Sequence, residues 1–348
     1  MKYQFLRNGL IIMLVTSMFL TGCGASDSSS DNSDEKDTEI EETLSDTADL
    51  KEDNWITDVT IDEQVIIDGE GVTVTVTGLN ATVNADVTEY YIEATVQNNT
   101  DKNLSIDFNS SSINGFSCYA VMNPVEQTES INLKFAPGET QAKISFPVKI
   151  TNILPIDKIG EIIFSSGSVE EQELTSMVNS EGETVEFYES KDEAYYSFDE
   201  IVIKTSAYDE SQIGKLPEGN VLYEGDGIKL ITAPTDNEDI LDEIFYLKND
   251  TDHYILLNVY DLKINGETMA APETLGIAFP RLEAPAGQVQ FGYFGNDEIT
   301  RSSLEIMGIG EIETIDCKLS IVRSFFYEDV MAADEIIVQD IEYSYSAE

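Results

Sequence analysis

Basic residues and histidine are scarce in this chain of 348 residues. It has 19 lysines and arginines against 67 acidic residues, so its formal net charge is −48, and it has a single histidine. Nucleic-acid binding needs a basic footprint, so this charge excludes nucleic acid as a partner. The same deficit argues against docking of the folded surface on anionic lipid headgroups. The acidic excess favours solubility and mutual repulsion at a crowded surface.

Cysteine is nearly as rare. Apart from Cys23 there are only Cys118 and Cys317, one in each half of the chain. Each stands in a run that alternates apolar and polar residues, so we expect it on the apolar face of a strand as a buried free thiol. The two positions are not equivalent in the repeat described below, and a disulfide framework is therefore not expected.

Long apolar runs are absent except at the start, where residues 9–20 (GLIIMLVTSMFL) follow Lys2 and Arg7. This run is short for a membrane span and predicts a cleaved signal peptide, residues 1–22. The next residues, Leu20 to Cys23 (LTGC), resemble the lipobox of bacterial lipoproteins. In that family the cysteine receives a diacylglycerol and becomes the first mature residue. The resemblance implies lipidation of Cys23 and a location on the outer face of the cytoplasmic membrane, facing the cell wall or exterior. The alternative is an ordinary secretory signal.

Large apolar side chains are also nearly absent from residues 24–53, which carry twelve acids and two lysines. Such a segment cannot bury enough surface to offset its ordering entropy. We expect residues 23–58 to form a lipid-anchored, acidic, disordered tether. As a flexible coil, its central thirty residues would span roughly 30 Å.

The remaining chain contains an internal repeat. Residues 96–115 (VQNNTDKNLSIDFNSSSING) and 247–266 (LKNDTDHYILLNVYDLKING) match at six of twenty positions without a gap. Shorter matches flank them, among them KIGEI with GIGEI and DEIVI with DEIIV. This pattern predicts a duplicated domain. The predicted boundaries are a first copy at 59–208, a linker at 209–219 and a second copy at 220–348.

Both copies have the pattern of β-strands. VTVTVTG (72–78) and LSIDF (104–108) alternate strictly, and Asn-Gly at 114–115 and 265–266 is a strong hairpin signal. We predict an all-β protein made of two tandem antiparallel β-sandwiches, with about seven strands each. One short helix per copy is expected, near 152–159 and 297–307.

These strands and turns resemble those of Gram-positive bacterial surface lipoproteins with tandem immunoglobulin-like domains. The shared pattern is an alternating strand that ends in Asn-Asn-Thr-Asp-Lys and a later Asn-Gly corner. The resemblance covers residues 60–348 and implies an extracytoplasmic immunoglobulin-like fold. Because that group has no generally assigned activity, the resemblance transfers no site residues.

Catalytic and metal-binding patterns are weak. His253 occupies the turn position that Lys102 holds in the first copy, which explains it without a catalytic triad. No cluster of histidine and cysteine suits zinc. The loop 236–243 (DNEDILDE) concentrates five acids, so calcium is an alternative to a solvated acidic loop, although no EF-hand spacing is present. We therefore predict no enzyme activity and no resident cofactor.

Aromatic residues offer the remaining candidate site. Phe325, Phe326 and Tyr327 are consecutive, and one face of a strand cannot bury three neighbours, so we expect part of this run to be exposed for binding. The resulting hypothesis is a non-enzymatic binding, adhesion or envelope-interaction module. Its partner would be a surface protein or the cell wall. The alternatives are an envelope enzyme with an unrecognised site and a passive envelope spacer.

Overall fold

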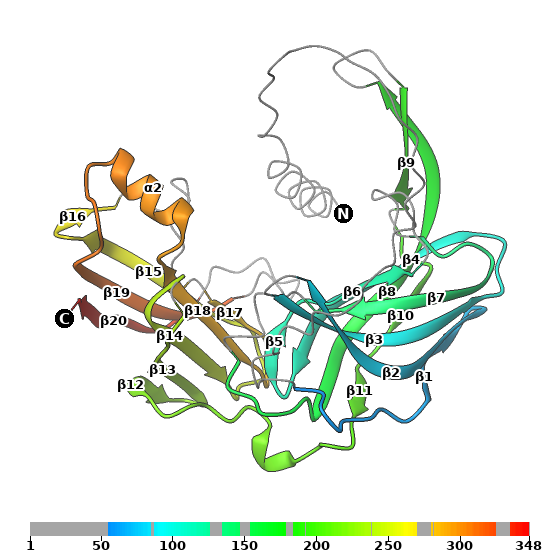
Figure 1. The fold of residues 1–348 in the computed structure, drawn as a ribbon, viewed down its shortest axis with the longest axis horizontal. Coiled ribbons are helices and arrows are strands. Elements are labelled where there is room, and N and C mark those ends of the chain that lie inside the picture. Colours follow the sequence, from blue (N-terminus) through cyan, green and yellow to red (C-terminus); the bar gives the residue numbers. More distant parts are fainter. Residues whose placement is uncertain are drawn as a thin grey trace, which may run out of the picture. The chain divides into compact units, whose positions relative to one another are not determined.

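The computed structural model describes much of the chain that follows residue 54. The described residues are 55–84, 87–125, 134–146, 154–178, 184–191, 193–237, 239–269, 280, 282–324 and 335–347. They form mainly antiparallel β-sheets with one α-helix, which confirms the predicted β class (Figure 1). Within these ranges, no helix has the length and apolar character needed to cross a membrane.

The first copy of the repeat builds two sets of paired strands. Their bounds are β1 Gln64–Gly69, β2 Val72–Asn84, β3 Val87–Asn98, β4 Asn103–Ile113, β5 Phe116–Cys118, β6 Val121–Pro124, β7 Gly138–Ser145, β8 Glu161–Val178, β9 Thr184–Ser190, β10 Tyr196–Phe198 and β11 Ile201–Lys204. One sheet has the order β1-β2-β3-β7-β6. The other set has the order β10-β8-β4-β5, and β9 and β11 also pair with β8. More strands are present than the predicted seven, because the long β8 pairs with several short partners.

The second copy repeats this arrangement. Its elements are β12 Asn220–Gly225, β13 Ile228–Pro234, β14 Ile240–Asn249, β15 Ile255–Ile264, β16 Glu267–Thr268, β17 Leu282–Ala284, β18 Val289–Gly295, α2 Glu298–Ile306, β19 Thr314–Arg323 and β20 Glu335–Ser346. The order β12-β13-β14-β18 corresponds to β1-β2-β3-β7, and β16-β15-β19 corresponds to β5-β4-β8. The internal repeat in the sequence is therefore also a repeat of strand pairing.

One of the flanking matches is out of register. Ile113 pairs with Ile162 in the first copy, and Ile264 pairs with Ile315 in the second. The first members differ by 264 − 113 = 151 residues and their partners by 315 − 162 = 153. The match between KIGEI (158–162) and GIGEI (308–312) implied an offset of 150. Those shared letters are thus not equivalent positions, and the strand pairing overrides the local similarity.

The two Asn-Gly pairs form the predicted hairpin turns. Asn114 and Gly115 have φ of 48° and 80°, and Asn265 and Gly266 have φ of 51° and 82°. They connect β4 to β5 and β15 to β16. A two-residue turn with positive φ at both positions matches the twist of the flanking strands, which is why asparagine and glycine stand here.

A buried asparagine explains the other shared letters. Asn98 donates to the carbonyl oxygens of Lys102 and Phe135 at 2.8 and 3.0 Å, and it accepts from the backbone N–H and the hydroxyl of Thr100. Asn249 makes four bonds of the same kind in the second copy. The Asn-x-Thr pattern is therefore a structural bracket that holds the end of one strand to the turn and to a neighbouring segment.

The copies are joined by a shared sheet. Val289 of β18 pairs in parallel with Phe116 of β5, which produces a ten-stranded sheet. Eight strands follow the order β10-β8-β4-β5-β18-β14-β13-β12, and β9 and β11 pair with β8 beside this path. Gln288 also donates to the hydroxyl of Ser165 in the first copy at 3.1 Å. Both copies belong to one compact unit.

The sheet of the second copy is consequently apolar on both faces. Ile244, Phe245, Tyr246 and Leu247 are consecutive in β14, and all are buried. Phe245 and Leu247 pack in the core of the second copy, whereas Ile244 and Tyr246 pack in the core of the first. This strand therefore contributes to the cores of both copies, because it is covered on both sides.

Two local expectations also need correction. The predicted tether ran to residue 58, but Trp55 is only 4% exposed and stacks on Tyr90 with ring centroids 5.1 Å apart. Residues 55–58 therefore belong to the folded unit. The helix expected near 297–307 is present as α2, whereas residues 154–159 contain no helix. Residues 152–153 lie outside the described part.

Candidate binding surfaces

Two of the predicted sites cannot be assessed in the structure. Cys23 and the aromatic run of Phe325, Phe326 and Tyr327 lie outside the described residues. Lipidation of Cys23 and binding through the aromatic run therefore stay predictions.

The acidic segment 236–243, which was expected to be a loop, is described except for residue 238, and its residues 240–243 belong to strand β14. The Asp242 carboxylate accepts a hydrogen bond from the Tyr345 hydroxyl at 2.5 Å, and the Glu243 carboxylate accepts one from Tyr343 at 3.0 Å. Burial, with the nearby carboxylates, raises the pKa of Tyr345 to about 12 and also raises that of Tyr343. These two tyrosines stay protonated as donors, so Asp242 and Glu243 are tied to β20.

The residues that the structure describes contain no group of three or more histidine, cysteine or carboxylate side chains that could hold a metal ion. His253 lies in its turn with Nδ1 2.8 Å from the Asp252 carboxylate, and its carbonyl oxygen accepts from Asn249. The carbonyl oxygen of Lys102 accepts from Asn98 in the same way. The predicted equivalence of His253 and Lys102 is confirmed.

The two cysteines of the folded unit are free thiols. Cys317 is 5% exposed in β19, as predicted, whereas Cys118 is half-buried and its sulfur lies 3.7 Å from the Ser111 hydroxyl oxygen. Desolvation raises the pKa of each thiol to about 12. A thiol with such a pKa is a poor nucleophile near neutral pH.

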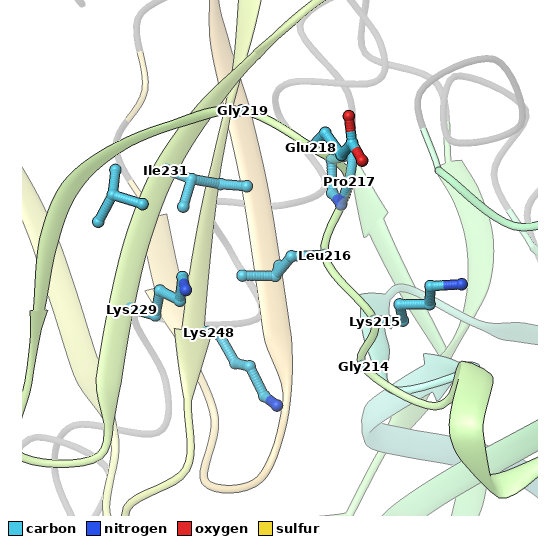
Figure 2. A pocket seen from close by; sticks show the side chains of 10 residues that line it. Gly214, Lys215, Leu216, Pro217, Glu218, Gly219, Lys229, Ile231 and Lys248 are labelled. Atoms are coloured by element: carbon cyan, nitrogen blue, oxygen red, sulfur yellow. The ribbon is translucent and has the colours of Figure 1, made fainter.

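A cleft of about 480 Å³ lies where the linker meets the second copy (Figure 2). Residues 214–219 form one side, and strands β12, β13 and β14 supply the other. Figure 2 shows Leu216 directed toward these strands and Lys215 directed away from them. Three lysines line the cleft, which is notable in so acidic a chain: Lys215, Lys229 and Lys248.

Each of these ammonium groups has a local acceptor. Lys229 lies 3.1 Å from Glu224, Lys248 lies 3.4 Å from Asp250, and Lys215 donates to the Gln212 side chain. Exposed pairs of this kind contribute little binding energy. The cleft has a small apolar floor, with Lys229 and Lys248 beside carboxylates and Lys215 beside a neutral amide.

The β8–β9 arm is the second candidate surface, defined here as residues 173–178 with residues 184–189. Figure 1 shows this hairpin extending away from the other strands. β4 pairs with β8 only as far as Gln172, so in the described chain Glu173–Val178 pairs only with β9. β19, the equivalent of β8, ends at Arg323, and residues 325–334 lie outside the described part. The arm is therefore a two-stranded ribbon in the described chain.

Four apolar side chains of the arm face solvent. The exposed fractions are 56% for Leu174, 56% for Met177, 65% for Val178 and 36% for Val185. The register places Leu174 and Val178 on one face and Met177 and Val185 on the other. Because its apolar groups are exposed on both faces, the ribbon has no core of its own to stabilise it. Such exposure of apolar groups is typical of interaction surfaces.

The base of the arm is held by charge. Glu171 accepts from Lys102 and Lys191 at 2.5 and 2.6 Å, and these bonds lower the pKa of its carboxyl group. The Lys102 ammonium also lies over the Tyr195 ring, 4.5 Å from its centroid. The arm thus projects from an anchored base. Sequence reasoning missed it, because apolar and polar residues do not alternate in 174–178 (LTSMV).

These features define a mainly antiparallel β protein with a duplicated strand pattern and a projecting hairpin. In comparisons with known proteins, the chain matches no family model, no curated protein and no solved structure.

Proposed function

We propose that this protein is a lipid-anchored extracytoplasmic lipoprotein that binds a surface protein or cell-wall partner without catalysing a reaction. Cys23 would hold it on the outer face of the cytoplasmic membrane, and two acyl chains would make that anchor stable. The basic start, the apolar segment and the Leu20–Cys23 motif support this location. The acidic segment 24–53 would act as a tether.

We further propose that the folded unit consists of two tandem immunoglobulin-like sandwiches. The repeated pairing order supports this, as do the two cores, each of which takes side chains from two sets of strands. The shared sheet would make the pair a stiff support for whatever surface the protein presents.

The β8–β9 arm is the observation that carries the binding proposal. It is held at its base, extends beyond the paired strands and exposes four apolar side chains. A passive spacer has no need of such a surface. The envelope-enzyme alternative would need convergent polar groups in a deep pocket, and the lysines of the cleft at residues 214–219 are instead paired with neighbours.

Two experiments with the full chain test the proposal on intact cells. Cys23→Ala should leave uncleaved precursor or release the protein into the medium. Photo-crosslinking of the wild-type protein should capture a partner at the cell surface. Processed protein that stays on the membrane after Cys23→Ala would refute the anchor, and turnover of a cell-wall substrate by the purified protein would refute the non-enzymatic role.

A further inference from the structure

We infer that the β8–β9 arm binds an extended, basic and apolar segment of a partner protein, which adds as a strand beside Glu173–Val178. This inference rests on the proposed binding function and names the partner's chemistry. It combines three observations on the arm: a free backbone edge, exposed apolar groups and a strong negative charge.

The free edge is the first observation. β8 is flanked on one side by β4 and on the other by β9, β10 and β11, but β4 ends opposite Gln172. Beyond that point, in the described chain, no strand lies along the side of β8 that faces β4. The backbone N–H and C=O groups on this edge are a template for a further strand. An added strand would continue the line of β4.

The exposed side chains favour β8 over β9 as the docking edge. Leu174, Met177 and Val178 of β8 are all more than half exposed, whereas Val185 of β9 is 36% exposed. On β9, the ring of Tyr188 is already covered by the Lys134 ammonium, 3.4 Å from the ring centroid. Alternate side chains of an added strand would therefore contact Leu174 and Val178 on one face and Met177 on the other.

Charge selects the partner. The residues of the arm contain three glutamates and no lysine or arginine, and the whole chain carries a net charge of −48. A second copy of this chain would bring the same charge to the contact and be repelled. A segment that alternates lysine or arginine with apolar residues would place cations among the glutamates and apolar groups against the arm. The geometry and the charge thus point to the same kind of partner.

The test uses a defined probe, an eight-residue peptide that alternates lysine and valine, with blocked termini. Its affinity for the full chain would be measured by fluorescence anisotropy. Three further peptides serve as controls: glutamate in place of lysine, glycine in place of valine, and methylated backbone amides at alternate residues. We expect each change to weaken binding by at least about tenfold, which corresponds to about 1.4 kcal/mol.

The protein variant follows from the register. Glu173 pairs with Glu189, so residues 174–188 can be replaced by Asn-Gly, which closes a two-residue hairpin at that pair. Shortening the arm should lower the affinity for the peptide by at least about tenfold. The circular dichroism spectrum and the thermal unfolding temperature should stay close to those of the wild type. If the shortened chain fails to fold, a milder variant provides the same test. Met177→Ser with Val178→Ser should also weaken binding of the peptide.

Matched controls separate the arm from general stickiness. Ile299→Ser and Ile336→Ser remove apolar groups that are 53% and 59% exposed elsewhere, and they should leave affinity unchanged. The acidic segment 24–53 is present in every variant, so its attraction for cations cancels in the comparison.

Four results would overturn the inference. Equal affinity of the shortened and wild-type chains would exclude the arm. Equal affinity of the methylated peptide would exclude strand addition. An arm-dependent dimer without peptide binding would show that the occupant is a second copy. Cell-surface crosslinks that persist with the shortened arm would refute this inference and leave the proposed function standing.

Discussion

The backbone N–H of Val289 donates to the carbonyl oxygen of Gly115 at 2.8 Å, and this bond joins the second copy of the repeat to the Asn-Gly turn of the first. It lies beside the parallel pair of Val289 and Phe116. The turn thus serves two purposes: it closes the hairpin of its own copy and presents an acceptor to the next. The equivalent turn at Gly266 closes the β15–β16 hairpin of the second copy.

We expect the two copies to unfold together. Tyr246 belongs to the second copy but is buried in the first core, where its ring meets that of Phe116 edge to face at 6.3 Å. Tyr246→Ala should lower the free energy of unfolding by about 3–5 kcal/mol. Trp55, the single tryptophan, lies in the first copy and reports on it by fluorescence. In urea unfolding of the variant, the midpoint measured by Trp55 fluorescence should shift together with the midpoint measured by circular dichroism. A shift seen by circular dichroism alone would show that the two copies unfold separately.

The two bracketing asparagines should be equally important. Asn98→Ala and Asn249→Ala each remove four hydrogen bonds, two of which the asparagine amide donates to backbone carbonyl oxygens. We expect each change to cost about 3 kcal/mol in urea unfolding. Asn99→Ala is the matched control, because Asn99 is exposed and should cost less than about 0.5 kcal/mol. Similar losses for Asn98 and Asn99 would contradict the bracket.

How much the sequence predicted depends on how local the interaction is. The Asn-Gly turns and the strand alternation were predictable, since a few adjacent residues encode them. The pairing of Phe116 with Val289 was not, because it joins residues far apart in the chain. The rule that one face of a strand cannot bury three neighbours also has a limit: Ile244 to Leu247 are all buried, because both faces of β14 are covered. Three consecutive large apolar residues, such as Phe325 to Tyr327, therefore do not by themselves predict an exposed side chain.

The buried thiol at Cys317 predicts a loss of stability in alkali. Burial raises its pKa to about 12, so the unfolded chain loses the thiol proton at lower pH than the folded chain. Stability from this group is constant below about pH 9 and falls as pH rises toward about 12. By about pH 10.5 the difference between wild type and Cys317→Ala should have changed by roughly 2 kcal/mol at most. A difference that does not vary between about pH 8 and 10.5 would contradict this.

The final prediction compares two glycines with nearly the same backbone conformation. Gly115 and Gly266 have φ of 80° and 82°, so alanine at either position carries the left-handed penalty of about 1–2 kcal/mol. A Cβ on Gly115 would lie 2.8 Å from the backbone nitrogen of Gly214 in the linker, whereas one on Gly266 would meet nothing within 4 Å. Gly115→Ala should therefore cost about 1–3 kcal/mol more than Gly266→Ala. The difference between the two losses in the free energy of unfolding, measured in urea, reports on the contact between the turn and the linker. Equal losses would show that the linker moves away from the added Cβ without cost.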